Sequence, residues 1–379
     1  MSELLPNNPF VVGKYVAERY FCDRKEETEF LIKQVKNGRN VALIAPRRIG
    51  KSDLIHHFFN QPDIKENYHV FFVDIYATTS LSEFVYRLGK EIYEQLKPRS
   101  TAWKEKFFQV IASLRVGFKL DSMTGMPTFD LRLGDIQSPQ TTLDEIFAYI
   151  NEADKPCIIA IDEFQQIGSY AEKNVEALLR TKIQRCQKAQ FIFSGSKRHM
   201  MSNMFNSSSK PFYQSAITMG LDAIPIETYT DFAIRLFEEN DRHLEPAVVR
   251  EIWQQYKGYT WFVQMMMNEL FALTPQDGTC HSGLLAEARR NVILSQENSY
   301  KDLMSNLPPR QKVILQAIAK EGIAQNITSS KFIKKYNINS ASSVQAAVKN
   351  LLKDDLVTQE DNTYRVYDFF FSEWLSTAF

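Results

Sequence analysis

NVALIAPRRIGKSDLI, residues 40–55, is the stretch that decides the fold of this chain. Its first half is a short apolar run followed by a turn signal, which is typical of a buried strand, and its second half opens a helix. Residues 45–52 match the last three positions of the pattern G-x-x-x-x-G-K-[ST], with Ala45 in place of the first glycine. At a turn from strand to helix this pattern predicts a phosphate-binding loop, because backbone N–H groups and a helix N-terminus attract anions there.

Three positions of this loop have distinct expected roles. Gly50 lets the backbone approach a phosphate, Lys51 reaches the β- and γ-phosphates, and the Ser52 hydroxyl coordinates Mg²⁺. Ala45 weakens the motif only if its position requires a positive φ, which costs alanine about 1 kcal/mol or more. The residues expected to bind ATP are Ala45, Pro46, Arg47, Arg48, Ile49, Gly50, Lys51 and Ser52. The two arginines of the loop either approach the phosphates or remain solvated.

A second motif, CIIAIDE at residues 157–163, places two carboxylates at the end of an apolar run. At the carboxyl end of a buried strand, Asp162 would hold the Mg²⁺ through a water, and Glu163 would orient and activate the attacking water. In-line attack on the γ-phosphate needs a positioned nucleophile and neutralised oxygens. The alternative is a strand that ends in solvated carboxylates, and the phosphate-binding loop on an earlier strand favours the functional interpretation.

Polar residues also follow two other predicted strands. Ser196, or else Ser194, ends the run FIFSGS and is expected to lie between the two motifs, where a hydroxyl senses the γ-phosphate or the water. A cap of the following helix is the alternative role for Ser196. Asp74 either stands behind the site or caps its own loop.

Arg180 and Arg185 lie on the helix predicted after the second motif. In oligomeric ATPases such arginines reach the γ-phosphate bound by a neighbouring subunit. On this sequence a solvated helix face is the favoured interpretation for both.

The rest of the first 225 residues alternates apolar runs with helical patterns. Because each run is apolar throughout, the pattern predicts an α/β fold with a parallel sheet covered on both faces. The predicted strands are 40–46, 69–75, 157–161, 191–196 and 216–221. The predicted helices are 25–38, 81–97 with a cap at Thr79 or Ser80, 101–113, one capped by Thr141 or Thr142 that ends near Ala153, and 171–187.

Alternating residues around a Gly-Met-Pro turn predict a β-hairpin near 114–133, inserted into a core domain of residues 1–225. Helical periods without strands predict a helical lid over 226–300. Three helices and a hairpin predict a winged helix-turn-helix over 301–379. The last segment, FFFSEWLSTAF, is apolar enough to dock on the body or on another subunit.

Composition limits the possible partners. The 379 residues include 45 Lys or Arg and 45 Asp or Glu, so no global field attracts nucleic acid. The four cysteines show no close pairing, and neither a disulfide nor a zinc site is expected. No apolar run approaches the roughly 20 residues that cross a bilayer, and the start MSELLPNNPF lacks the features of a signal peptide. No membrane contact and a cytoplasmic location are therefore expected.

Four stretches together resemble the archaeal-type ATPase family, which is STAND-like and related to the AAA+ ATPases. They are FCDRKEETEFL, NVALIAPRRIGKSDL, CIIAIDEFQQI and FIFSGSKRHMMSNMFNSSSKPFYQSAITMGLDAI. The resemblance covers roughly residues 8–270, and it implies an ASCE-type P-loop NTPase core with a helical lid and a C-terminal winged helix. It also implies that Phe21 and Arg24 pack near the adenine.

Two positions depart from the family pattern. Ala45 replaces the usual first glycine of the phosphate-binding loop. Gly258-Tyr259-Thr260 stands where the family often has Gly-x-Pro near the nucleotide, which puts lid sensing of the nucleotide in doubt.

The winged helix has two candidate roles. DNA binding would place Ser342, Ser343, Gln345 and Lys349 of the recognition helix in the major groove. Residues 301–379 carry ten Lys or Arg and eight Asp or Glu, and the wing tip carries Glu360 and Asp361. So few net positive charges favour a protein contact over DNA.

Three functions are consistent with these observations. The first is a Mg²⁺-dependent ATP hydrolase that acts as a nucleotide-driven conformational switch. The second is a slow or non-hydrolysing scaffold, gated by ATP or ADP, that signals through self-assembly or a protein partner. The third is a DNA-binding regulator that uses the winged helix.

Overall fold

The computed structural model describes residues 7–13, 15, 17–96, 118–120, 127–129, 136 and 138–378. It divides the chain into two compact units. We call Gly13–Ile224 the core unit, and Met1–Val12 with Pro225–Phe379 the helical unit. Among the described residues, no helix combines the length and the apolarity needed to span a bilayer.

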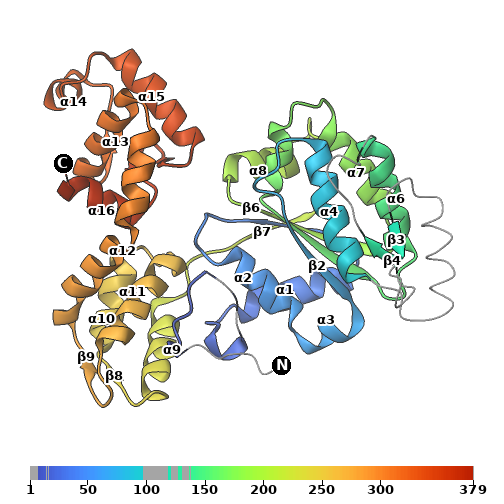
Figure 1. Ribbon diagram of the computed structural model, residues 1–379, viewed down its shortest axis with the longest axis horizontal. Coiled ribbons are helices and arrows are strands. Elements are labelled where there is room, and N and C mark those ends of the chain that lie inside the picture. The colour runs from blue at the N-terminus through green and yellow to red at the C-terminus, as the bar shows by residue number, and fades with distance from the viewer. Residues whose placement is uncertain are drawn as a thin grey trace. The chain divides into compact units, whose positions relative to one another are not determined.

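A five-stranded parallel sheet forms the centre of the core unit (Figure 1). Its strand order is β2-β5-β6-β1-β7, and every ladder within it is parallel. The strands are β1 (Val41–Ile44), β2 (His69–Asp74), β5 (Cys157–Asp162), β6 (Ala189–Gly195) and β7 (Ile217–Gly220). All five predicted strands are thus confirmed, and the carboxyl ends of β1, β5 and β6 lie side by side.

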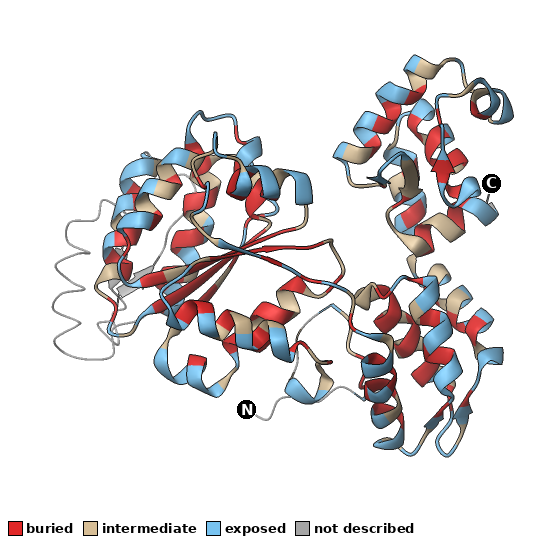
Figure 2. Cartoon of the chain, turned by 180° about the vertical axis from the view of Figure 1, so that it is seen from behind, coloured by how far each residue is buried: buried red, intermediate tan, exposed pale blue. Residues whose placement is uncertain are grey.

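Helices cover both faces of this sheet, and the central strands β1, β5 and β6 are buried between them (Figure 2). Alternate residues of β5 point to opposite faces, so Ile159 joins one apolar cluster and Ile158 the other. The first cluster includes residues of α4 (Leu81–Gln95), α6 (Pro139–Asn151), α7 (Val175–Arg185) and α8 (Arg198–Asn206). The second includes residues of α1 (Lys25–Lys36), α2 (Lys51–Phe59) and α3 (Pro62–Asn67). The 3-10 helices η1 (Glu18–Tyr20) and η3 (Phe164–Ser169) complete the core unit.

Two helix starts can be compared with their predicted caps. Ser80 caps α4, because its side chain accepts a hydrogen bond from Glu83 N at 3.3 Å, and Glu83 accepts one from Thr79 N in return. The prediction that Thr141 or Thr142 caps the helix ending near Ala153 is wrong. That helix, α6, begins at Pro139 with Ser138 as the N-cap residue, since proline is well suited to the first turn.

Part of the predicted hairpin lies within the described residues. Strand β3 (Phe118–Leu120) pairs antiparallel with β4 (Pro127–Phe129), with Phe118 opposite Phe129. The remainder of 114–133, and the helix predicted over 101–113, lie outside the described residues.

The first helices of the helical unit pack around Phe10. These helices are α9 (Ile226–Glu238), α10 (Pro246–Gln255), α11 (Thr260–Leu273) and α12 (Leu285–Asn306), with short strands β8 (His243–Leu244) and β9 (Thr279–Cys280) and the 3-10 helix η4 (Ser282–Leu284). Phe10 is fully buried, and its ring lies within 5.5 Å of Phe237 and 6.0 Å of Phe271. Asn268 Nδ2 donates to the Phe10 carbonyl at 2.7 Å. These contacts explain why Met1–Val12 belongs to this unit, although the sequence places residues 1–225 in one core domain.

The C-terminal part of the helical unit has the fold of a winged helix. Its elements are α13 (Pro309–Glu321), β10 (Ala324–Gln325), α14 (Ser330–Lys335), α15 (Ala341–Lys353), β11 (Val357–Glu360), β12 (Thr363–Val366) and α16 (Phe369–Ala378). The three strands form an antiparallel sheet in the order β10-β12-β11. The predicted boundary at 300/301 falls inside α12, which continues to Asn306.

The apolar last segment forms α16 and packs within the helical unit. Phe370 is fully buried, with its ring 5.2 Å from Tyr256 and 5.5 Å from Phe262. Phe371 packs on Tyr300 of α12 at 5.0 Å. Helix α16 therefore connects the winged helix to the helices of residues 226–306.

Candidate functional site

The predicted phosphate-binding loop connects β1 to α2. Gly50 is the N-cap residue of α2 and has φ 98°, a left-handed conformation that favours glycine. A Cβ at Gly50 would meet nothing within 4 Å, so the backbone angle and not the space requires glycine there. Arg48 also has a positive φ, of 65°, whereas Ala45 does not. The missing first glycine therefore causes no backbone strain at Ala45.

The Lys51 side chain folds back on its own loop. Its ammonium donates to the Pro46 carbonyl at 3.0 Å, and the residue is only 6% exposed. Burial lowers the pKa of Lys51, and the nearby carboxylates of Glu163 and Asp162 oppose that shift. A desolvated ammonium among backbone donors is suited to a phosphate.

Ser52 and Asp162 bring the two sequence motifs together. Ser52 Oγ donates to Asp162 Oδ2 at 2.8 Å, and Glu163 N donates to Asp162 Oδ1 at 3.0 Å. Asp162 ends β5 and is 8% exposed. A hydroxyl and a carboxylate are oxygen ligands of the kind that Mg²⁺ takes alongside phosphates and water. The described part of the chain contains no group of three or more His, Cys, Asp or Glu that could hold a metal by itself. Mg²⁺ bound with a nucleotide needs no such group, because phosphates and waters supply most of its ligands.

The Glu163 carboxylate lies among three donors. Ser196 Oγ donates to Glu163 Oε2 at 2.7 Å, and Gln165 Nε2 donates to the same oxygen. Arg47 Nε lies 3.9 Å from the other oxygen, Oε1. Glu163 itself has φ 56°, a left-handed conformation that marks the turn after β5. The sequence analysis did not identify Gln165 as a residue of the site. Its position two residues after Glu163, in the run DEFQ, is the sequence feature that could have identified it.

The two candidate serines have different surroundings. Ser194 is 0% exposed and pairs in register with Leu43 inside the sheet. Ser196 is half-buried just beyond the end of β6, where its hydroxyl reaches Glu163. The structure therefore brings Ser196, and not Ser194, into contact with the predicted catalytic carboxylate.

Asp74 and Arg47 border this site. Asp74 pairs in register with Asp162 and accepts a hydrogen bond from Tyr76 N at 2.8 Å, so it caps its own loop. Burial raises the pKa of Asp74, and the charges of Asp162 and Glu163 add to that rise. The Arg47 guanidinium lies 5.1 Å from the ring centroid of Tyr76, which is 56% exposed.

Arg24 links the phosphate-binding loop to the segment after β7 through hydrogen bonds. Its NH2 group donates to the carbonyls of Asp222 at 2.7 Å and Ile49 at 3.4 Å, and its NH1 group pairs with Glu27 at 2.8 Å. Phe21 stacks on His57 of α2, with ring centroids 4.2 Å apart and planes 15° from parallel. The family resemblance places Phe21 and Arg24 near an adenine, and that role stays a prediction.

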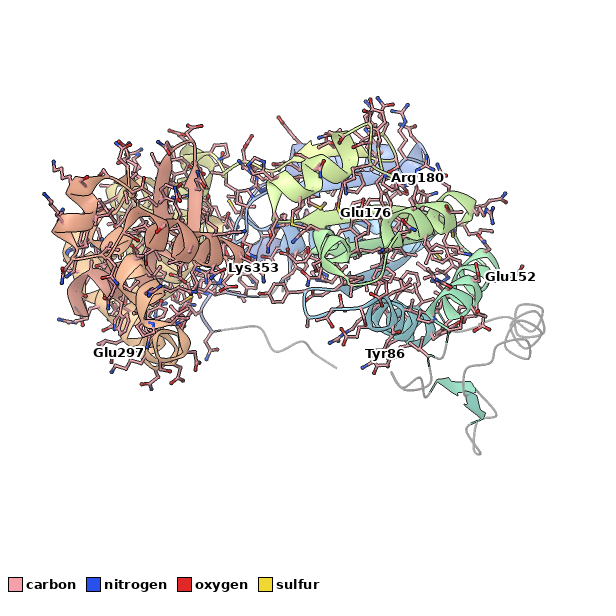
Figure 3. All side chains as sticks on the ribbon, turned by 90° about the horizontal axis from the view of Figure 1, so that it is seen from above. Tyr86, Glu152, Glu176, Arg180, Glu297 and Lys353 are labelled. Atoms are coloured by element: carbon pink, nitrogen blue, oxygen red, sulfur yellow. The ribbon has the colours of Figure 1, made fainter. Side chains whose placement is uncertain are left out.

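The two arginines of α7 differ in their exposure. Arg180, labelled with Glu176 in Figure 3, donates to Gln184 Oε1 at 2.9 Å on the same helix. Arg185 is exposed at the end of α7. Arg180 is only partly exposed, and its Nε atom is buried without a hydrogen-bond partner among the described residues, so the solvated helix face fits Arg185 better than Arg180.

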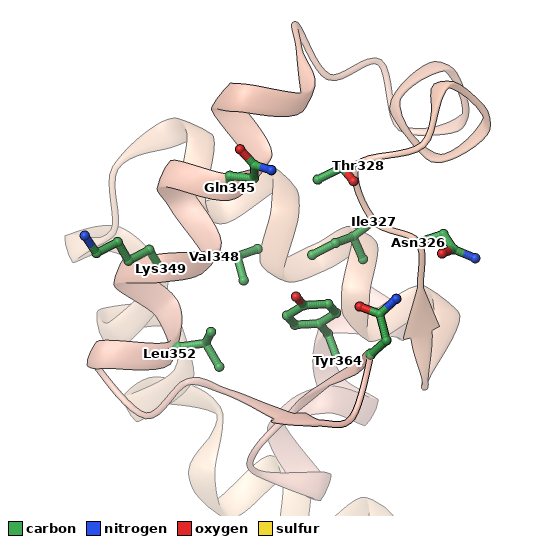
Figure 4. Close-up of a pocket in the computed structure, with 9 residues that line it drawn as sticks. Asn326, Ile327, Thr328, Gln345, Val348, Lys349, Leu352 and Tyr364 are labelled. Atoms are coloured by element: carbon green, nitrogen blue, oxygen red, sulfur yellow. The ribbon is translucent and has the colours of Figure 1, made fainter. Parts of the chain in front are cut away.

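The predicted recognition helix, α15, borders a groove of about 470 Å³ in the winged helix (Figure 4). Gln345 and Lys349 line it from α15, opposite Tyr364 of β12. Ser342 and Ser343 lie at the start of α15, where Ser340 Oγ accepts a hydrogen bond from Ser343 N at 3.2 Å.

Comparison with known proteins gives a family and a fold. Residues 21–265 match the model of an ATPase domain predominantly from Archaea, and residues 298–377 match that of a probable winged helix domain. No curated protein matches this chain.

Solved structures of similar fold cover nearly the whole chain. A Walker-type ATPase of Pyrococcus abyssi has 19% identity and a TM-score of 0.62, over 97% of this chain and 99% of that one. The ORC2 protein of Aeropyrum pernix in its ADP form has 14% identity and a TM-score of 0.55, over 97% and 98%. The ORC1 protein of Aeropyrum pernix in complex with DNA has 11% identity and a TM-score of 0.54, over 94% and 92%. At identities this low, the TM-scores above 0.5 show a shared fold. The family model spans more than half of the sequence, and the chain therefore belongs to the family of ATPase domains found predominantly in Archaea.

Proposed function

We propose that this ATPase-family chain binds ATP and Mg²⁺, hydrolyses ATP to ADP and phosphate, and uses the cycle as a conformational switch. One observation carries the proposal above all others. The hydrogen bond of 2.8 Å from Ser52 to Asp162 joins two motifs that are 110 residues apart in sequence. A phosphate-binding loop and a metal-binding carboxylate then share one end of a parallel sheet, where ligands of open α/β folds bind.

Different residues of the site bind the phosphates, bind the metal and orient the attacking water. Backbone N–H groups of residues 47–52 and the Lys51 ammonium hold the phosphates. Ser52 and Asp162 hold the magnesium, which neutralises charge on the phosphate oxygens when bound. Glu163 orients the attacking water, and Ser196 senses the γ-phosphate through its bond to Glu163.

A switch is consistent with the way the chain connects its units. The chain passes between the core unit and the helical unit twice, at 12/13 and at 224/225. A conformational change at the nucleotide can therefore reach the helical unit through two chain connections. In other nucleotide switches, contacts to the γ-phosphate order connecting segments, and hydrolysis releases them.

Steady-state phosphate release tests the hydrolase. The wild type should release phosphate from ATP with Mg²⁺. Glu163→Gln should lose turnover and keep ATP bound, because it removes the base and leaves the phosphate-binding loop intact. A wild type that binds ATP and releases no phosphate would leave the nucleotide-gated scaffold as the function.

The charges of the winged helix favour a protein contact or self-assembly over DNA binding. Lys349 is the only charged residue that lines the described groove next to α15. Glu360 and Asp361, both exposed at the wing, would repel phosphates. Size-exclusion chromatography with and without ATP should show a nucleotide-dependent change of assembly. Tight binding to DNA that survives moderate salt would instead support the DNA-binding regulator.

A further inference from the structure

The two oxygens of the Glu163 carboxylate have different surroundings. Oε2 accepts hydrogen bonds from two neutral donors, Ser196 Oγ at 2.7 Å and Gln165 Nε2. Oε1 faces the phosphate-binding loop, where Arg47 Nε lies 3.9 Å away. One oxygen is thus held by the core, and the other points toward the substrate side.

We propose that Gln165 is a positioning residue that, with Ser196, fixes Oε2 of Glu163 and leaves Oε1 to orient the attacking water. This inference rests on the hydrolase function proposed above. The orientation of the amide follows from chemistry, because an ionised carboxylate only accepts hydrogen bonds and must face the NH₂ end of the glutamine.

The fold holds Gln165 rigidly in this place. It lies in η3, directly after Phe164, which is fully buried with its ring 4.5 Å from Phe193 and 5.2 Å from Phe212. Gly195 of β6 admits the amide, because a Cβ at that position would lie 2.5 Å from Gln165 Oε1. The Gly195 carbonyl also accepts a hydrogen bond from Ala45 N at 3.3 Å, so the residue that admits Gln165 borders the phosphate-binding loop as well.

Stability alone does not account for this glutamine. Gln165 is 2% exposed, and its Oε1 atom has no hydrogen-bond partner among the described residues. A buried acceptor without a partner is costly, whereas an apolar side chain of the same shape would carry no such cost. A residue kept at a cost to stability is typical of a functional site.

Gln165→Met tests this role, because methionine keeps the volume of glutamine and removes the N–H donor. We expect kcat for phosphate release to fall about ten-fold or more, since a hydrogen bond to a charged group is lost. The KM for ATP should stay within about two-fold, because Gln165 contacts the carboxylate and not the phosphate-binding loop. The midpoint of thermal unfolding should stay level or rise.

Gln166→Met is the matched control. Gln166 is the next residue of η3, and its amide donates to the Thr78 carbonyl at 3.1 Å, away from Glu163. This variant should keep kcat within about two-fold. Glu163→Gln serves as the reference for complete loss of turnover.

The outcomes separate this inference from the function on which it rests. An active wild type with an equally active Gln165→Met would overturn the positioning role and leave the hydrolase intact. Equal losses of kcat in both methionine variants, with lower unfolding temperatures, would assign Gln165 a structural role only. A wild type that releases no phosphate would overturn both the hydrolase and the positioning role.

Discussion

The Ser52 hydroxyl donates a hydrogen bond of 2.8 Å to the Asp162 carboxylate, which ties the first turn of α2 to the end of β5. The bond links a helix that would bind phosphate with a strand that would bind metal. Each partner is an oxygen ligand suited to Mg²⁺, and their pairing supports the proposed site for a metal-bound nucleotide.

Asp162→Asn should weaken the binding of ATP only when Mg²⁺ is present. Loss of the charged ligand should lower the affinity for Mg²⁺-ATP by about 10- to 100-fold, and the affinity measured in EDTA should change little. Isothermal titration with and without Mg²⁺ checks this. Asp74→Asn is the control, because Asp74 lies beside Asp162 in the sheet and caps its own loop. An equal loss with and without Mg²⁺ would contradict the assignment of Asp162 as a metal ligand.

Lys51→Met should separate stability from ligand binding. Burial lowers the pKa of Lys51, so the charged side chain costs free energy in the folded state without nucleotide. The variant should unfold at the same or a higher temperature than the wild type when no nucleotide is present. ATP with Mg²⁺ at 100 times its Kd should stabilise the wild type by about 2.7 kcal/mol and the variant by far less. Thermal unfolding with and without nucleotide measures both, and a variant stabilised as much as the wild type would rule out Lys51 as a phosphate ligand.

Arg24→Met should destabilise the core unit by about 2–3 kcal/mol, since hydrogen bonds to a buried charged group are lost. The Arg24 guanidinium bridges the Ile49 and Asp222 carbonyls and pairs with Glu27. Urea unfolding measures the change, and Arg39→Met, at an exposed position near the end of α1, should stay within about 0.5 kcal/mol. Equal effects of the two substitutions would show that the Arg24 contacts do not stabilise the fold.

Cys157→Ala should reduce the loss of stability at alkaline pH. Burial raises the pKa of the Cys157 thiol to about 12, whereas a thiol in an unfolded chain titrates near 8.5. Between these two pH values the folded chain keeps a proton on Cys157 that the unfolded chain releases. The stability of the fold is therefore unaffected by this thiol below about pH 8.5, and it falls as pH rises from there toward 12. For each pH unit in this range, the free energy of unfolding should fall less in the variant than in the wild type, by up to about 1.4 kcal/mol. Urea unfolding between pH 8 and pH 10.5 checks this, and parallel curves for the two proteins would contradict it.

Phe370→Ala should destabilise the helical unit by about 3–5 kcal/mol, because it empties a fully buried site between Tyr256 and Phe262. Leu294→Ala is the control, since Leu294 is 57% exposed on α12 and should change stability by less than about 0.5 kcal/mol. Urea unfolding of the full chain measures both. A mild effect of Phe370→Ala would mean that α16 is not needed to hold the winged helix in place.

The sequence predicted the elements whose signals are local. Apolar runs identified all five parallel strands, and three helices with a hairpin identified the winged helix. The cap of α6 and the strand β10 were missed, and the strands β8 and β9 contradict the prediction that residues 226–300 contain no strands. Pro139 outweighed the threonines that follow it, and a strand of two residues has no period to detect. The site depended on the same local signals, since Lys51, Ser52 and Asp162 stand in patterns with fixed spacing.

By itself, the sequence determined that a phosphate-binding loop and an acidic strand end exist in one parallel α/β sheet. Only the tertiary structure decided which side chains surround Glu163. Gln165 and Ser196 reach one oxygen and Arg47 approaches the other, and a Cβ at Gly195 would lie too close to the amide. Local periodicity fixes which residues form a strand or helix, whereas contacts between residues far apart in the chain depend on how strands order in the sheet and on how closely two backbones approach.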